Sequence, residues 1–201
     1  MLRRLLLHDS LPVRFAARLG LGLSLFYVSW IVAYALLPEA VLRGKSGAAV
    51  LAGTEAAPSL LFEFIRIAAI NLAIAGLFIV LPNRLLQIDG YPLGYLPPLL
   101  WFVHYGLLLG TNSFSVPMPE PLAPSWTVLA RSGLYEIGAY CLIAASTHSI
   151  AVARSPRLFS FASEPVRPRP PFLAGVHKAG LGWALAVLLV SNLWEAYRIV
   201  S

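Results

Sequence analysis

The sequence has little charge and almost no cysteine. Charged residues make up 12% of its 201 positions, which is about half of the roughly 25% found in soluble domains. Such a scarcity excludes an ordinary soluble domain, whose surface carries many charged side chains. The single cysteine, Cys141, excludes an intrachain disulfide, so cysteine usage says nothing about the redox compartment.

Motifs that carry catalysis or bind cofactors are also missing. The chain has no glycine-rich phosphate loop, no paired-histidine metal motif and no nucleophile elbow around a serine. From these absences we expect a protein that is not an enzyme. We also expect it to need neither a metal nor another cofactor.

What the sequence does contain is apolar residues, which make up 58% of the chain. Five stretches are long and apolar enough to cross a bilayer, which takes about 20 helical residues. They predict an all-α fold, a polytopic transmembrane bundle of about five helices that forms a single domain over residues 1–201. We expect the spans near Leu19–Leu37, Ser59–Pro82, Tyr95–Asn112, Trp126–Ala153 and Val176–Ile199.

The basic residues indicate how such a bundle is oriented. The net charge is +6, and most of the 15 basic residues are arginines that sit between apolar stretches rather than on an amphipathic face. This distribution favours contact with anionic lipids over nucleic-acid binding. Because cytoplasmic loops carry an excess of Lys and Arg, we expect a cytoplasmic N-terminus. Ten basic residues lie on that side (Arg3, Arg4, Arg14, Arg18, Arg84, Arg154, Arg157, Arg167, Arg169 and Lys178) and three on the other (Arg43, Lys45 and Arg198).

Three polar residues, which we call the midplane cluster, lie deep inside these stretches. At about 1.5 Å per residue, Asn71 lies roughly 18 Å and Glu136 roughly 15 Å from the outer ends of their spans. His104 lies roughly 13 Å from the inner end of the third span, so all three fall near the middle of a core about 30 Å thick. A polar group in hydrocarbon usually faces a partner or a cavity. The cluster fits either a polar clasp that fixes helix register or a proton or ion relay.

A second charged group is expected nearer the outer surface. Glu63 and Arg66 are three residues apart, the spacing at which side chains on one helix face can pair. Arg131, on the fourth span, reaches a comparable depth. Pairing lowers the cost of placing both charges in hydrocarbon. We therefore favour structural pairing over a gating or substrate role.

Glycines predict where the helices pack closely. Gly106 and Gly110 have the spacing that lets two helix backbones approach each other, and Gly133 and Gly138 offer small residues on the fourth span. We therefore expect a tight contact between the third and fourth spans.

Several of these motifs resemble those of one known family. Ile70–Leu72 with the following Gly76, then His104–Gly110, and then Ser132–Ala139 are similar to the stage II sporulation protein M family. That family typically shows an apolar helix with a central Asn, a helix with spaced glycines, and a helix in which Gly precedes Glu. The resemblance implies a non-enzymatic integral membrane protein that holds partner proteins.

Two functions from different classes follow as expectations. The first is a scaffold or accessory subunit of a larger complex, whose partners are other integral membrane proteins, anionic lipids at the cytoplasmic face and, in a homo-oligomer, further copies of the chain. The alternative is a proton- or ion-translocating transporter or channel component that uses the midplane cluster. A pathway would need polar residues continuing to both surfaces, and the cytoplasmic half offers no matching set, which favours the scaffold. In either case we expect a multi-pass protein of a bacterial cell membrane.

Overall fold

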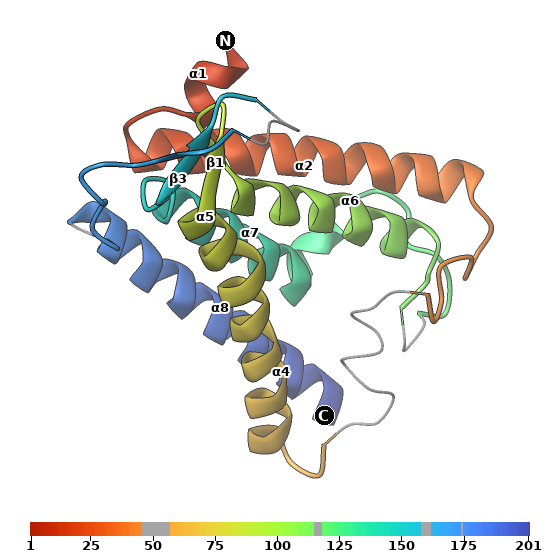
Figure 1. Ribbon diagram of the computed structural model, residues 1–201. Coiled ribbons are helices and arrows are strands. Elements are labelled where there is room, and N and C mark those ends of the chain that lie inside the picture. The colour runs from red at the N-terminus through yellow and green to blue at the C-terminus, as the bar shows by residue number, and fades with distance from the viewer. Residues whose placement is uncertain (46–56, 115–117, 158–161, 174) are drawn as a thin grey trace.

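Helices make up most of the chain, which confirms the all-α class. The computed structural model describes residues 1–45, 57–114, 118–157, 162–173 and 175–201 (Figure 1). In chain order the helical elements are α1 (Leu2–Leu6), α2 (Leu11–Leu36), α4 (Leu60–Ile74), the π-helix η1 (Ala75–Val80), α5 (Leu81–Leu85), the short 3-10 helix η2 (Leu93–Tyr95), α6 (Leu96–Gly110), the 3-10 helix η3 (Trp126–Ala130), α7 (Ser132–Ser146) and α8 (Val176–Val200).

Four helical segments are long and apolar enough to cross a membrane, and they match the first, second, third and fifth expected stretches. The first of them begins at Leu11 rather than Leu19, because Pro12 is well suited to the first turn of a helix. Arg14 and Arg18 therefore belong to this helix instead of preceding it. The four segments are Leu11–Leu36, Leu60–Leu85, Leu93–Gly110 and Val176–Val200.

The fourth expected stretch, Trp126–Ala153, does not form one long helix. Its α-helical part, α7, has 15 residues, which corresponds to about 22 Å and is shorter than a hydrocarbon core of about 30 Å. α7 begins only after Arg131, whose backbone is extended (φ −123°, ψ 140°). It ends at Ser146, just before Thr147, whose hydroxyl bonds back to the carbonyl oxygen of Ile143. The described residues thus contain four candidate spans where the sequence predicts about five.

The second long helix contains a widened turn. α4, η1 and α5 run without a break from Leu60 to Leu85. Pro82 lies at the start of α5 and has no N–H, so it cannot pair with the carbonyl group of Phe78 in the α-helical pattern. The π-helical turn just before it absorbs the missing bond without ending the helix.

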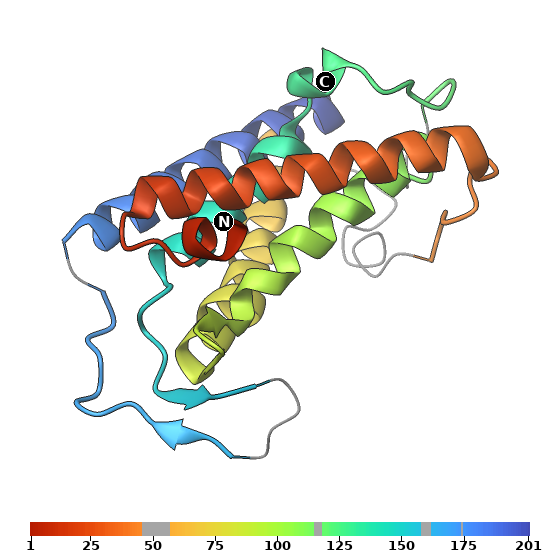
Figure 2. The ribbon, with the colours of Figure 1, turned by 90° about the horizontal axis from the view of Figure 1, so that it is seen from above.

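The long helices form two groups that diverge from a common end (Figures 1 and 2). In the first group, α2 and α6 run side by side in the same direction, since Gly22 faces Phe102 and Gly110 faces Ala33. In the second group, α8 packs against both α4 and α7, and α7 also contacts η1, α2 and α6. α7 is therefore the element that joins the two groups.

A small sheet lies at the end where the two groups meet. It ties the N-terminal segment to the loops after α5 and α7, because Arg3 pairs with the carboxylate of Asp89 at 2.8 Å. Asp89 and Gly90 have φ angles of 50° and 83°, as the tight hairpin turns that favour Asp-Gly require. We call this end, made of α1, the sheet and the adjoining helix ends, the basic end. The strands, in the spatial order β2–β1–β3–β4, are β1 (Leu86–Ile88), β2 (Tyr91–Pro92), β3 (Ala153–Ser155) and β4 (Glu164–Pro165).

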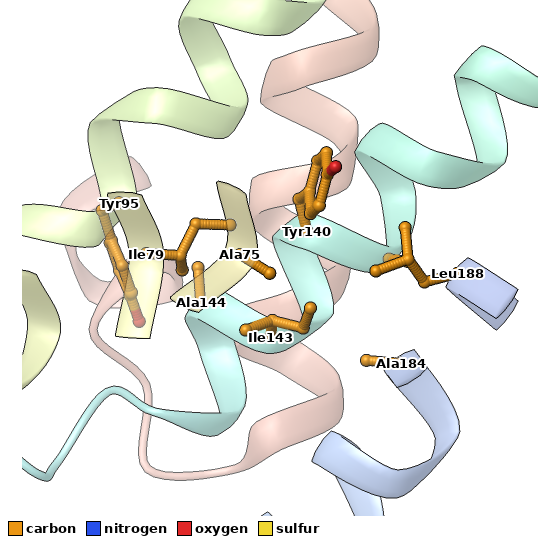
Figure 3. Packing of buried hydrophobic residues seen from close by; sticks show 9 residues of the cluster. Ala75, Ile79, Tyr95, Tyr140, Ile143, Ala144, Ala184 and Leu188 are labelled. Carbon is orange, nitrogen blue, oxygen red and sulfur yellow. The ribbon is translucent and has the colours of Figure 1, made fainter. Parts of the chain in front are cut away.

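Each helix group has its own hydrophobic core. Between α2 and α6 the core is aromatic: the ring of Phe26 lies 5.3 Å from that of Trp30 and 5.6 Å from that of Tyr105 between centroids. Between α4, α7 and α8 it is built from smaller side chains (Figure 3), chiefly Ala75, Ile79, Ile143, Ala144, Ala184 and Leu188.

Candidate functional site

Three helices bring polar side chains together inside the second helix group. Nδ2 of Asn71 in α4 donates to Oδ1 of Asn192 in α8 at 2.7 Å and to Oε2 of Glu136 in α7 at 3.4 Å. The hydroxyl of Tyr140 donates to the main-chain carbonyl oxygen of Asn71 at 3.5 Å. We call Asn71, Glu136, Asn192 and Glu195 the central polar cluster. Its hydrogen bonds tie α4, α7 and α8 together at one level.

Glu195 contributes a second carboxyl group to this cluster. Its side chain lies beside that of Glu136. Neighbouring carboxylates repel each other when both are ionised, so a shared proton favours their approach. Apart from this neighbour, no described donor reaches the buried Oε1 of Glu136. The pair is therefore able to hold a proton as well as to join α7 to α8.

The third residue of the midplane cluster lies apart from the other two. Among the hydrogen bonds and ion pairs of the described chain, none links His104 to Asn71 or Glu136. Gly106, two residues along α6, faces α2. Residues two apart in a helix point about 200° away from each other, so His104 lies on a different side of α6. The structure thus brings Asn71 and Glu136 together and leaves His104 out.

An apolar layer separates the central polar cluster from the basic end. One to three turns along the second long helix, α7 and α8, the side chains that meet are mainly apolar (Figure 3). Ala75, Ile79, Ile143, Ala144, Ala184 and Leu188 are each at most 4% exposed, and Tyr140 among them is 5% exposed. Beyond this layer Nδ2 of Asn83 donates to Oγ1 of Thr147 at 2.7 Å and to the carbonyl oxygen of Ala144 at 3.2 Å. The polar contacts between these helices therefore fall on two levels with mainly apolar packing between them.

The expected outer charged group is only partly assembled. Arg66 Nη2 lies 2.5 Å from Glu63 Oε1, and the side chain of Glu63 is fully buried. The other oxygen of Glu63 accepts a hydrogen bond from the main-chain N–H of Ala57 at 2.8 Å. Arg131 instead donates to the sulfur of Met118 at 2.8 Å. Within the described residues the ion pairs do not include Arg131.

The paired glycines of α6 pack against a different helix from the one expected. A Cβ atom on Gly106 would overlap Ser29 Oγ of α2. One on Gly110 would lie only 2.7 Å from the main-chain nitrogen of Tyr34, also in α2. Main-chain atoms cannot move aside as a flexible side chain can, so this contact depends on glycine. Gly106 and Gly110 therefore pack against α2, the first long helix, and not against the fourth stretch.

The glycines of α7 differ from each other. A Cβ on Gly133 would lie 3.0 Å from the ring of Tyr105 in α6, so α7 and α6 do touch there. A Cβ on Gly138 would have only Leu19 near it, at 3.9 Å. The expected contact between α6 and α7 therefore involves Gly133, whereas Gly138 has room for a larger side chain.

The basic end holds two buried arginines of α2, Arg14 and Arg18, which are 2% and 1% exposed. Arg14 donates to the main-chain carbonyl oxygens of His8 (2.6 Å), Asp9 (3.2 Å) and Ala145 (3.1 Å). In the described residues neither arginine forms an ion pair. The groups that hydrogen-bond to Arg14 and Arg18 are neutral main-chain oxygens, and Asp9 is an acidic group that acts on Arg14.

Arg18 is held by a single aromatic residue. Its Nη2 donates to the main-chain oxygen of Tyr95 at 2.7 Å, and its guanidinium carbon lies 3.5 Å from the centre of the same ring. The hydroxyl of Tyr95 lies 2.7 Å from Nδ1 of His148, which follows α7. Burial, together with the charges of Arg14 and Arg18, lowers the pKa of His148 to about 3. The His148 ring is therefore neutral at physiological pH.

Two cavities lie at the basic end. The first, of about 510 Å³, is lined by polar side chains of the sheet, α2 and the start of α8, including Arg14, His148 and Arg154. The second, of about 480 Å³, is lined mostly by apolar side chains around Arg18 and Tyr95. Polar and apolar cavities therefore lie beside arginines that are one helical turn apart.

Sequence reasoning missed Asn192 and Glu195, although a signal for both was present. They are polar residues three positions apart inside the fifth apolar stretch, the same signal that singled out Asn71 and Glu136. The sequence predicts a first span that begins near Leu19, so that Arg14 and Arg18 precede it. Their burial depends on contacts with the distant residues Tyr95 and Ala145.

Comparisons with protein-family models, with curated proteins and with solved structures found no match to this chain. Within the described ranges, the His, Cys, Asp and Glu side chains form no group of three or more that could hold a metal ion. The candidate site is therefore assessed by its own chemistry. Its amides and its carboxyl pair are suited to joining helices or to holding a proton.

Proposed function

We propose that the chain is a multi-pass membrane protein that acts without catalysis, as a scaffold or accessory subunit that binds other membrane proteins. The observation that carries this proposal is the apolar layer between the central polar cluster and the basic end. A path for protons or ions needs polar groups or water from one surface to the other. A mainly apolar layer across three packed helices supports a structural use of the cluster, as a clasp that fixes how α4, α7 and α8 meet.

We further propose five crossings, with the basic end in the cytoplasm. The direction of the helices supports this, because α2, α6 and α8 lead away from the basic end while α4 and α7 lead back to it (Figure 1). Although α7 is short, Ser146 at its end lies beside Gly180, and Ala130 just before it accepts a hydrogen bond from Arg198. The part of α8 between these contacts is about 27 Å long, nearly the thickness of the hydrocarbon core. The excess of arginine at the basic end sets the orientation.

Cysteine labelling tests the orientation. Cys141 is fully buried, so added cysteines report on their own positions. Ala123 and Ser163 are both exposed, and we place Ala123 outside and Ser163 inside the cell. A membrane-impermeant maleimide should label Ala123→Cys in intact cells, and Ser163→Cys only after permeabilisation. Labelling of Ser163→Cys in intact cells would overturn the orientation.

The surface that we propose for partner binding lies on α4. This helix leans away from α2 and α6 and packs chiefly on α8 (Figure 1). Its free face carries Leu61, Phe62 and Ile65, which are 63%, 62% and 51% exposed. In a bilayer such a face can meet lipid, another membrane protein or a second copy of this chain. Large apolar side chains next to the clasped interface would pack well against a partner helix.

Affinity purification in mild detergent, followed by mass spectrometry, tests the scaffold role. The native chain should retain a membrane protein in stoichiometric amount, or a differently tagged copy of itself. Phe62→Ala should weaken that association, whereas Val28→Ala, on an exposed face of α2, serves as the matched control and should leave it unchanged. Purification of a monomer without any stoichiometric partner would argue against the proposal.

The transporter alternative is favoured by one specific observation, the carboxyl contact between Glu136 and Glu195. If the pair moves protons, proteoliposomes that contain the native chain should show a proton flux that Glu136→Gln abolishes. The scaffold proposal expects no flux above that of empty liposomes, in the native chain or in the variant. A flux that depends on Glu136 would replace the scaffold with a transporter.

A further inference from the structure

The basic end contains a buried charge, that of Arg14, which forms no ion pair with a described residue, although the acidic Asp9 acts on it. The guanidinium group of Arg14 is almost fully buried and is held by three main-chain oxygens. Arg18, equally buried and one turn along α2, at least has the face of Tyr95 against its charge. Taking an ion out of water costs several kcal/mol unless an opposite charge compensates. Arg14 is therefore a position where a bound anion would stabilise the fold.

The cavity that Arg14 lines has further groups suited to an anion. At about 510 Å³ it is far larger than the share of about 30 Å³ that one water occupies in the liquid. Its polar lining adds Gln87, His148, Ser149, Arg154 and His177, with Asp9 as the one acidic side chain among the lining residues. Positive and neutral hydrogen-bonding groups thus outnumber the negative one.

Two of these lining residues have buried nitrogens that are left unpaired. Among the described residues no hydrogen-bond partner reaches Nε of Arg14 or Nδ1 of His177. Buried polar atoms in native proteins are nearly always bonded to protein or to a ligand or water. A bound ligand could complete the hydrogen bonding of Arg14, which is 2% exposed, and of His177.

The start of α8 adds a further positive contribution. His177 lies in the first turn of this helix, which has 25 residues. The free N–H groups and the dipole of a helix N-terminus favour a negative charge. Arg14 on α2, Arg154 on β3 and the first turn of α8 therefore act on the same cavity from three separate segments.

We infer that this cavity binds a phosphate group, carried either by the headgroup of an anionic phospholipid or by a small soluble phosphate compound. Phosphate offers several acceptor oxygens, and arginine binds it through short charge-assisted hydrogen bonds. In the proposed topology the cavity lies where α2 and α8 reach the cytoplasmic surface, at the depth of lipid headgroups. The inference does not depend on the scaffold role, because it concerns the basic end and not the partner surface of α4.

Thermal unfolding of the purified full-length chain in a neutral detergent tests the inference. Four additions are compared: phosphatidylglycerol, phosphatidylcholine, glycerol 3-phosphate and inorganic phosphate. A lipid site predicts that phosphatidylglycerol alone raises the unfolding temperature. A site for soluble phosphate predicts that glycerol 3-phosphate or inorganic phosphate raises it as well. Both outcomes support a phosphate site and separate its two sources.

Two exposed arginines at the same end provide the variant and its control. Arg154 lines the cavity, whereas Arg169 is exposed and is not among the lining residues. In Arg154→Gln, the same rise in unfolding temperature should need about ten times more of the stabilising compound, because a charge-assisted contact to phosphate is lost. Arg169→Gln also removes one arginine charge and should leave the required concentration unchanged. Arg14 is kept intact, since its hydrogen bonds hold the end of α7.

Two results would overturn the inference. One is that phosphatidylglycerol, glycerol 3-phosphate and inorganic phosphate each raise the unfolding temperature no more than phosphatidylcholine does. The other is an equal loss of the response in Arg154→Gln and Arg169→Gln, which would show attraction of anions by the basic end as a whole. Native mass spectrometry of the same samples gives an independent readout, since a specific site retains one phosphate-bearing molecule per chain.

Discussion

The two helix groups are held together in different ways. α2 and α6 approach each other at Gly106 and Gly110, so closely that their main chains touch, and aromatic rings fill the space beside them. α4, α7 and α8 are joined by amide and carboxyl groups, with Asn71 at the centre. In a bilayer, lipid tails are as apolar as the helices, so burial alone does not bring helices together. Each group therefore needs a specific contact, and the two groups use different ones.

This difference predicts different responses to substitution. A contact made by main-chain atoms depends on shape, and any added side chain separates the helices. A contact made by polar side chains depends on hydrogen bonding, and it should tolerate a replacement that keeps the same donors and acceptors. Substitutions in the two groups test this difference.

The largest effect is expected in the first group. Gly110→Leu would force a side chain into the main chain of Tyr34 and Trp30 and should lower the free energy of unfolding by about 3 kcal/mol or more. Gly20→Leu is the matched control on α2, because no heavy atom lies within 4 Å of a Cβ at that position. Reversible unfolding in mixed micelles measures both. Equal stability of the two variants would show that the close contact does not hold α2 to α6.

A smaller effect is expected in the second group. Asn192→Leu removes the acceptor for Nδ2 of Asn71 and should cost about 1–3 kcal/mol, because it leaves a half-buried amide without its main partner. Ser191→Ala is the neighbouring control, since the hydroxyl of Ser191 bonds only within its own helix, to the carbonyl oxygen of Leu188. If both variants unfold alike, the central polar cluster does not clasp α4 to α8.

His148 joins the two groups through Tyr95 and predicts a pH dependence. Its pKa is lowered to about 3 in the folded chain, against about 6.5 in an unfolded one. Above pH 6.5 the ring is neutral in both states. Between about pH 6.5 and 3 only the unfolded chain takes up the proton, so stability should fall by about 1 kcal/mol per pH unit as the pH is lowered.

His148→Asn should make this loss of stability shallower, because asparagine does not titrate in the range. Unfolding temperatures measured from pH 7 to pH 5 check the expectation, with His8→Asn as a control for the loss of a histidine. An unchanged slope in His148→Asn would mean that other groups cause the acid sensitivity.

The smallest effect is expected at Glu136. Glu136→Gln keeps the size and the acceptor that faces Asn71, and it removes one of two neighbouring carboxyl groups, so the free energy of unfolding should change by less than about 1 kcal/mol. Partner association should also persist. Glu136→Leu removes both oxygens and should weaken folding and association together. The clasp interpretation fails if Gln is as damaging as Leu.

The positions of the long helices follow from local sequence. Hydrophobic length is a property of consecutive residues, and four of the five expected stretches are helices long enough to span a bilayer. The fourth stretch differs because its helix has only 15 residues and begins after an extended backbone at Arg131. Hydropathy averages over such a local break and does not detect it. The hairpin at Asp89–Gly90, by contrast, had a clear local signal that was overlooked.

The partners of the polar residues were harder to predict than their depth. The sequence indicated that Asn71 and Glu136 lie at one level, and the structure brings them together. Depth says nothing of the direction in which a side chain points, and His104, at a similar depth, lies on another side of α6. Asn192 and Glu195 were overlooked although they lie in an apolar stretch. Their role became apparent only once α8 was seen to pack against α4 and α7.

Local sequence is enough to predict a chain that is all-α, rich in long apolar helices and basic at one end, because length, hydropathy and charge are sums over neighbouring residues. Which helices meet is a property of the three-dimensional fold. It directed the glycines of α6 to α2 rather than to α7, paired residues 86–88 with 153–155 in a sheet, and buried Arg14 and Arg18 beside two cavities. Such contacts depend on the rotation and direction of helices far apart in the chain. No local pattern encodes these relations, and together they create the candidate sites.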